Sequence, residues 1–253
     1  MSDSRPDDVV GFVIDSDERV GTGGFLEIRR LRMRNRRADG SISPSYVCDS
    51  IARPYGQDAV IVCVYARDTS GIDARRGFDE TSRGIDHEAP LDAIGSPPAR
   101  IRVLLRDGLR PPLSLGRDAS IAPLPEEPSG MFVTELVAGI IEPSDRGEDG
   151  LRARAAAEVL EEAGFVVDPA RIAILGAGSL PSPGALIEKF YFCAVEVDPA
   201  TQRPLAGDGS PMEEGARTRW LDLDAAIDAC LRGELCDLKT ELGLRRLREH
   251  LAR

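Results

Sequence analysis

The chain has 253 residues, of which 42% are hydrophobic, and a formal net charge of −11 at pH 7. This size fits one large domain or one domain with an appendage, and the hydrophobic content is that of a globular chain with a buried core. The acidic balance, without a basic cluster spaced by aromatics, argues against nucleic acid as a partner, because its phosphates must be met by concentrated Lys and Arg. The longest apolar run, Ala59 to Ala66, is too short to cross a membrane, so we expect no membrane partner either.

The chain begins with a polar, acidic stretch, and residues 1–20 are expected to lack regular structure at their start. Residues 24–52 then predict a β-hairpin, with extended runs from Phe25 to Met33 and from Ser45 to Ile51. The Asp39-Gly40 dipeptide between these runs is typical of a hairpin turn. The hairpin could be a separate small β unit or an ordinary extension of a single domain.

Three further strands are predicted between residues 59 and 137. The apolar, β-branched run 59–65 is typical of a strand buried on both faces. Residues 68–99 show no periodicity and predict a long loop, whose role the sequence leaves open. Residues 101–105 form the next strand, which leads into Leu109-Arg110-Pro111-Pro112, and 132–137 form a third.

The most informative stretch is a predicted helix over residues 149–163. Glu158 and Glu162 stand four residues apart on one face of this helix, and Glu161 lies beside them. The opposite side is apolar and could seat the helix on a sheet, and Gly164 suits a left-handed helix end. Carboxylates on one stripe repel one another unless a cation lies between them, and hard oxygen ligands suit Mg²⁺ or Mn²⁺. The alternative is an acidic helix face that is simply solvated.

The rest of the chain predicts a turn, two strands and two helices. Ser182-Pro183-Gly184 is a good turn sequence. Strands are predicted over 190–197 and 218–221, and the loop between them carries Glu213 and Glu214. Helices over 224–231 and 237–251 close the chain, the second with a broad leucine face.

The segment 135–139, the acidic helix and the closing Gly164-Phe165 together resemble the Nudix box, whose pattern is G-x5-E-x7-R-E-U-x-E-E-x-G-U. Aligned from its end, this pattern places the family's metal-binding glutamates on Glu158, Glu161 and Glu162, and the resemblance adds the Ala138 carbonyl as a metal ligand. The metal implied is Mg²⁺ or Mn²⁺.

The first half of the box departs from the family pattern. The chain between Gly139 and the helix is four residues longer than the pattern allows. The position of the family arginine holds Ala157, and the earlier family glutamate falls on Asp149. Arg154 lies four residues before Glu158, so it is our candidate for the orienting work of the missing arginine.

The resemblance implies a fold and a domain organisation. The fold class is α/β, a Nudix α/β/α sandwich around a mixed sheet, with an N-terminal β-hairpin extension. Residues 1–54 would form this extension and residues 55–253 the hydrolase domain. A small β unit ahead of the box resembles the N-terminal region of ADP-ribose pyrophosphatases, which there helps to build a homodimer. We therefore expect a homodimer.

Further motifs resemble the ADP-ribose pyrophosphatase branch. Arg110 sits in a stretch similar to that branch's Q-F-R-P motif, which makes it a candidate contact to the substrate. The stretch 182–188 resembles the branch's S-P-G-x-x-x-E motif and makes Pro183, Gly184 and Glu188 candidate substrate-binding residues. Glu214 best matches the catalytic glutamate of that branch's mobile loop, with Glu213 beside it.

The function implied is metal-dependent hydrolysis of a nucleoside diphosphate sugar, with ADP-ribose to AMP and ribose 5-phosphate as the leading reaction. A UDP-sugar pyrophosphatase is the main alternative among enzymes. A catalytically weak Nudix domain that senses a nucleotide is a second alternative, supported by Ala157 and the longer box. The five cysteines are odd in number and contain no C-x-x-C pair, and the N-terminus has no signal-peptide core, so we expect reduced thiols and a cytoplasmic protein.

Overall fold

The structure is a computed structural model of the chain, and it describes residues 9–21, 23–24, 26–53, 58–68, 100–115, 123, 130–205 and 210–253. The predictions for Phe25, for the loop after residue 68 and for a domain boundary at 54–55 lie outside the described residues. The chain divides into two compact units. Unit 1 comprises 1–60, 140–151 and 176–191, and unit 2 comprises 61–139, 152–175 and 192–253.

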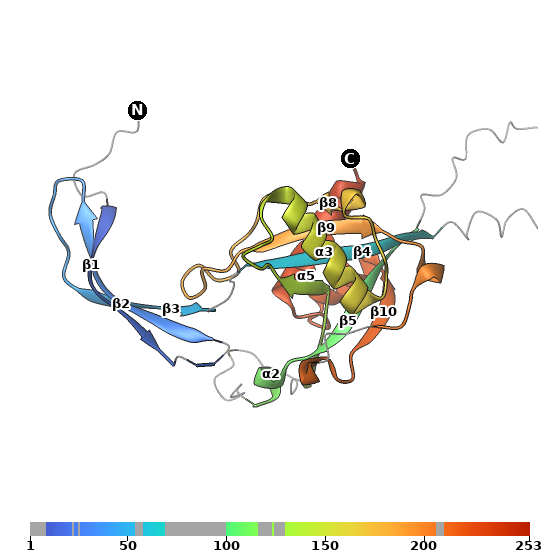
Figure 1. The fold of residues 1–253 in the computed structure, drawn as a ribbon, viewed down its shortest axis with the longest axis horizontal. Coiled ribbons are helices and arrows are strands. Elements are labelled where there is room, and N and C mark those ends of the chain that lie inside the picture. Colours follow the sequence, from blue (N-terminus) through green and yellow to red (C-terminus); the bar gives the residue numbers. More distant parts are fainter. Residues whose placement is uncertain are drawn as a thin grey trace, which may run out of the picture. The chain divides into compact units, whose positions relative to one another are not determined.

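Unit 1 contains a three-stranded antiparallel sheet in the order β1-β2-β3 (Figure 1). The predicted hairpin is present as β2 (Glu27–Arg37) and β3 (Tyr46–Ala52), joined by a turn in which Gly40 has a φ of 83°. Only a residue without a Cβ adopts this φ readily, which explains the Asp-Gly signal.

The first strand, β1 (Val9–Val20), was not among the strands predicted from the sequence, and residues 1–8, where the irregular start was expected, lie outside the described residues. It pairs with β2 along its whole length. Asp17 lies 2.6 Å from an Arg29 nitrogen and Asp15 lies 2.5 Å from one of Arg34. These acidic residues read as a polar tail in the sequence, but they are the cross-strand complements of an arginine-rich strand.

A second, seven-stranded sheet has the order β10-β5-β4-β9-β8, with β6 paired to β5 and β7 paired to β4. Its strands are β4 (Ala59–Asp68), β5 (Arg100–Leu109), β6 (Phe132–Glu135), β7 (Val137–Ile140), β8 (Ala173–Ile174), β9 (Phe190–Glu196) and β10 (Arg217–Asp222). Side chains 59–66 of β4 are all buried, as predicted for a strand covered on both faces. The single strand expected over 132–137 is two strands, because the chain changes partner at Leu136.

Helices cover both faces of this sheet, with α3 (Gly147–Ala163) in front and α5 (Leu238–Leu251) behind it (Figure 1). The predicted α/β/α sandwich around a mixed sheet is confirmed. The remaining helices are α2 (Pro111–Leu115), α4 (Leu223–Leu231) and the short 3-10 turns η2 (Pro169–Arg171), η3 (Pro199–Thr201) and η4 (Pro211–Glu213).

Helix α3 carries the predicted apolar side, except that Leu160, which the sequence also assigned to this side, is 38% exposed. Ala155, Val159 and Ala163 repeat at intervals of four residues and are all fully buried. The helix ends at Gly164, which has a φ of 75°, and the Phe165 N–H donates to the Val159 carbonyl at 3.3 Å. This Schellman-type ending orients the last turn, which carries Glu161 and Glu162.

Helix α5 packs closely on the sheet at Gly243. A Cβ at this position would collide with Leu136 and would also meet Cys63 and Phe192. All five cysteines are free thiols, and Cys63 is among the buried ones. Within the described residues, no helix has both the length and the apolar character needed to cross a membrane.

Candidate active site

The predicted metal-binding glutamates project from the last two turns of α3. Glu158 is only 9% exposed, and its carboxylate lies against the backbone of Gly139 on β7. A Cβ at position 139 would overlap this carboxylate, so glycine is needed there for close approach and not for an unusual φ. The box glycine and the box glutamate, distant in sequence, therefore meet in the fold.

The raised pKa of Glu158 shows that several carboxylates lie close to its side chain. Burial and, next, the neighbouring carboxylates of Glu162 and Glu161 raise the pKa of Glu158 to about 7. Glu213 acts in the same direction, whereas Arg154, 3.8 Å from the Glu158 carboxylate, opposes the rise in this pKa. Arg154 thus contacts the glutamate that it was predicted to orient. Its effect on the pKa of Glu158 is smaller than the combined effect of burial and the neighbouring carboxylates.

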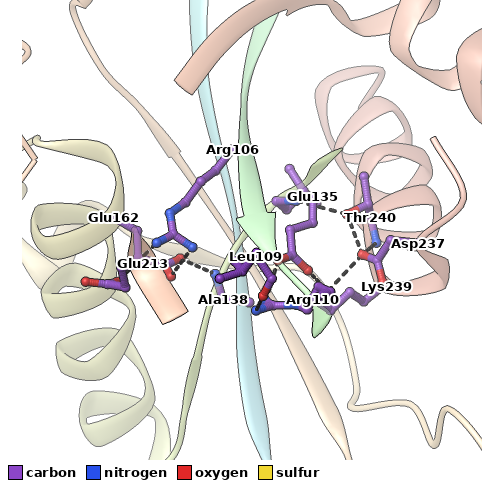
Figure 2. A network of polar contacts seen from close by, with 11 residues as sticks. Arg106, Leu109, Arg110, Glu135, Ala138, Glu162, Glu213, Asp237, Lys239 and Thr240 are labelled. Carbon is purple, nitrogen blue, oxygen red and sulfur yellow. Dashed lines mark hydrogen bonds and ion pairs between the residues drawn. The ribbon is translucent and has the colours of Figure 1, made fainter. Parts of the chain in front are cut away.

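Glu162 is held from two directions. The Ala138 N–H donates to Glu162 Oε2 at 3.0 Å, and a guanidinium nitrogen of Arg106 lies 2.9 Å from Oε1 (Figure 2). Burial is the largest effect on the Glu162 carboxyl and raises its pKa, whereas Arg106 and the Ala138 N–H act to lower this pKa. Ala138 thus contributes its N–H to the cluster, and the predicted role of its carbonyl remains a prediction.

Arg106 is the residue that sequence reasoning missed. It lies on β5, is 4% exposed, and uses one terminal nitrogen for Glu162 and the other for Glu213, at 3.1 Å (Figure 2). The available signal was weak: an arginine directly after the apolar strand 101–105. A buried arginine is expected to be paired, but the sequence does not show its partners.

The two adjacent acids of the predicted catalytic loop have different surroundings. Glu213, the last residue of η4, faces Arg106 and acts on the pKa values of Glu158 and Glu162. Glu214 is exposed, and its N–H closes a turn to the Pro211 carbonyl at 3.3 Å. The structure therefore brings Glu213, the second choice from sequence, to the carboxylates of α3.

A second polar network lies near the first and includes the predicted substrate contact Arg110. Glu135 is 3% exposed and forms ion pairs with Arg110 and Lys239 (Figure 2). Lys239 also lies 2.9 Å from Asp237, which accepts a hydrogen bond from the Thr240 hydroxyl. The Arg110 side chain remains 40% exposed, so part of its guanidinium faces outward.

The other predicted substrate-binding residues belong to unit 1. Glu188 is buried and lies 3.2 Å from a nitrogen of Arg53. Pro183 and Gly184 are exposed in a turn closed by the Ala185 N–H and the Ser182 carbonyl, at 3.0 Å. The Glu188–Arg53 pair and the turn at 182–185 both lie within unit 1.

The donor set fits a divalent cation chemically. Burial first, and neighbouring carboxylates next, raise the pKa values of Glu158 and Glu162, and carboxylate oxygens are the ligands that Mg²⁺ and Mn²⁺ prefer. Among the described residues, no group of three or more His, Cys, Asp or Glu is arranged to hold a metal as it stands. The Arg106 guanidinium is a cation that Glu162 and Glu213 share, at 2.9 Å and 3.1 Å.

Comparison with known proteins supports the fold. No protein-family model and no curated protein sequence matches the chain. The crystal structure of an ADP compounds hydrolase is similar, with a TM-score of 0.59 and 14% identity over 96% of each chain. A MutT/nudix family protein from Enterococcus faecalis has a TM-score of 0.35 and 14% identity over 66% of this chain and 44% of its own, which is too low to carry an argument. The chain therefore has a Nudix-like fold, and its activity must be argued from its site.

Proposed function

We propose that this protein hydrolyses the pyrophosphate bond of a nucleoside diphosphate sugar with a divalent metal, and that ADP-ribose is converted to AMP and ribose 5-phosphate. The observation that carries this proposal is the crowding of the Glu158, Glu161 and Glu162 carboxylates at the end of α3, with Glu158 pressed against Gly139. The similarity to an ADP compounds hydrolase over nearly the whole chain favours this substrate class.

Glu158, Glu161 and Glu162 would hold Mg²⁺ or Mn²⁺, with the Ala138 carbonyl as a further ligand. When bound, such an ion neutralises the charge of the pyrophosphate and lowers the pKa of a water, from about 15.7 toward neutrality. The protein itself would then position the metal-binding carboxylates. The Ala138 N–H holds the Glu162 carboxylate in place, and Gly139 leaves room for Glu158 beside the β7 backbone.

Glu213 is the better placed of the two candidate general bases, because its carboxylate lies beside the cluster and Glu214 points to solvent. It would accept a proton from the attacking water as the phosphorus–oxygen bond of the bridge breaks, and AMP and ribose 5-phosphate would leave. General-base catalysis typically contributes about 10²–10⁴-fold to a rate. Arg110, Pro183, Gly184 and Glu188 are proposed to bind the nucleotide and sugar ends of the substrate.

The domain and assembly predictions belong to the same proposal. Residues 55–253 would form the hydrolase domain and residues 1–54 a dimerisation element of a cytoplasmic homodimer. The β1–β3 sheet is suited to association because Ile28, Val47 and Ile51 are exposed on it, at 42%, 48% and 36%.

A nucleotide sensor is the second candidate, and one observation favours it. Arg106 already neutralises Glu162 and Glu213, and the box lacks its arginine at Ala157. Such a domain would bind the nucleotide and turn it over slowly or not at all. Hydrolysis of a UDP-sugar remains the alternative within the enzyme class.

The deciding experiment is a turnover assay with alkaline phosphatase coupling. The panel is ADP-ribose, UDP-glucose, GDP-mannose, NADH and diadenosine polyphosphates, each with Mg²⁺, with Mn²⁺ and with EDTA. Metal-dependent phosphate release that is fastest with ADP-ribose is the expected result. A preference for UDP-glucose would transfer the protein to the UDP-sugar class. Absence of turnover with the whole panel in folded protein, together with nucleotide binding by calorimetry, would favour the sensor.

A further inference from the structure

Arg106 connects two parts of the candidate site that are remote in the chain. One terminal nitrogen meets Glu162 on α3 at 2.9 Å, and the other meets Glu213 of η4 at 3.1 Å. The two contacts use different nitrogens of one planar guanidinium, so the distance between the two carboxylates is determined by the shape of this group. The strand β5, held between β4 and β10, provides a rigid base for it.

The burial of Arg106 makes this bridge more than a surface ion pair. The side chain is 5% exposed, against 13% for Glu162 and 21% for Glu213. Its Nε is buried and finds no hydrogen-bond partner among the described residues. Leaving one donor of a buried guanidinium unsatisfied is unfavourable, so the position is maintained by the two carboxylates that the terminal nitrogens reach.

The segment that carries Glu213 is a short turn just before β10. It contains a one-turn 3-10 helix, Pro211–Glu213, closed by local hydrogen bonds from the N–H groups of Glu213, Glu214 and Ala216. Local turns of this kind open easily unless a side chain anchors them to the core. The contact with Arg106 supplies such an anchor.

We propose that Arg106 is a positioning residue, which holds Glu213 and the segment 210–216 against Glu162 on α3. This inference deepens the proposed function and rests on it, because it assigns Arg106 to the placement of the general base. Arg106 acts through Glu213 and not on the substrate itself. Its positive charge also lies beside the carboxylates that would hold the metal, so it weakens the attraction of this cluster for a divalent cation.

The test compares wild type with Arg106→Gln by three measurements. Hydrogen–deuterium exchange of peptides covering 210–216, without metal, is expected to speed up by about tenfold, as for the loss of one charge-assisted hydrogen bond. The Kd for Mn²⁺ alone, measured by isothermal titration calorimetry, is expected to fall by about threefold or more, since a like charge is removed. For turnover of ADP-ribose we expect kcat to drop by roughly 10²-fold, with KM changed by less than about threefold.

Arg102→Gln is the matched control. Arg102 lies on the same strand and also has a buried Nε without a hydrogen-bond partner in the described structure, but its guanidinium stacks over Trp220 at 5.7 Å. We expect wild-type exchange at 210–216, Mn²⁺ affinity and kcat for this variant. Arg106→Lys is expected to restore only part of kcat, because an ammonium group cannot reach two carboxylates as a planar fork does.

Glu213→Gln tests the same contact from the exposed side if Arg106→Gln does not fold. It should raise exchange at 210–216 to the same extent, and the double variant should show no further increase. Unchanged exchange and unchanged Mn²⁺ affinity in both folded single variants would overturn the proposal. Faster exchange and tighter Mn²⁺ binding in a protein that hydrolyses none of the panel would support the anchor and reject the proposed enzyme instead.

Discussion

Two polar networks lie close together in unit 2, and they differ in how their charges balance (Figure 2). In the first, the buried Glu135 and the half-buried Asp237 face Arg110 and Lys239, so that each carboxylate has a cation. In the second, the carboxylates of Glu158, Glu161, Glu162 and Glu213 act on one another, with Arg106 and Arg154 as the cations that contact them.

The difference separates a network whose balanced charges stabilise the fold, with the partly exposed Arg110 at its edge, from a cluster whose crowded charges suit a cation. In the balanced network, the charges stabilise the junction between β6 and the start of α5, where the Thr240 hydroxyl accepts from the Leu136 N–H at 2.9 Å. In the crowded cluster, the pKa values of Glu158 and Glu162 are raised, so the folded chain keeps an arrangement that is unfavourable without a cation. Such perturbed groups are typical of functional sites.

The largest effect is expected for Glu162→Gln, which removes a charge from the crowded cluster while keeping its shape. Mg²⁺-dependent turnover should fall by roughly 10³-fold or more, because charge stabilisation by a bound metal is worth several kcal/mol. Steady-state kinetics and circular dichroism measure activity and folding in parallel. Near-wild-type activity of this variant would show that the metal assignment is wrong.

A substitution in the balanced network should lower the stability of the fold and not act first on turnover. Glu135→Gln leaves Lys239 and Arg110 facing a neutral group, and we expect the free energy of unfolding to drop by roughly 3 kcal/mol, as when a buried ion pair loses one partner. Urea denaturation at pH 7 measures this change. Glu234→Gln is the control, since the Glu234 side chain is 60% exposed in its pair with Arg232 and should change stability by less than about 1 kcal/mol. Equal effects of both substitutions would contradict the structural role.

The two adjacent acids of the loop should differ in their effect on turnover. Glu213→Gln is expected to reduce kcat by about 10²-fold, because it removes the general base beside the cluster. Glu214→Gln, at the exposed neighbouring position, should change kcat by less than about threefold. The same coupled phosphate assay measures both variants. The reverse order would restore Glu214, the first choice from sequence, as the base.

The smallest effect concerns pH and the metal-free protein. A raised pKa means that folded Glu158 binds its proton more tightly than unfolded Glu158, so its ionisation destabilises the fold progressively between about pH 4.5 and pH 7. Glu158→Gln removes this penalty and should stabilise the protein in EDTA at pH 8, by at most about 3 kcal/mol, while changing little at pH 4.5. Thermal unfolding at both pH values measures the difference. Equal shifts at both pH values would argue against crowding of charge at Glu158.

Much of the fold and part of the site followed from local patterns. The continuous apolar run of β4, the spacing of Ala155, Val159 and Ala163 on α3, and the Gly164 ending were all readable from the chain. So was the shared helical face of Glu158 and Glu162. These features depend on residues within one or two turns of each other, and helix period and strand burial determine them directly.

Pairings between distant segments could not be read in this way. The acidic residues of β1 appeared to be a polar tail until β2 placed Arg29 and Arg34 opposite them. The strand expected over 132–137 changed partner at Leu136, which a run of apolar residues does not reveal. In both cases, the neighbour in the sheet, and not the local pattern, decided the structure.

The sequence by itself therefore determined that three carboxylates share one face of a capped helix within an α/β fold. Only the tertiary structure decided what faces them: Gly139 beneath Glu158, Arg106 between Glu162 and Glu213, and Glu214 turned to solvent. The physical reason is the distance along the chain over which each effect acts. Backbone periodicity acts over a few residues, whereas the balance of buried charges depends on which remote side chains the sheet brings within about 4 Å.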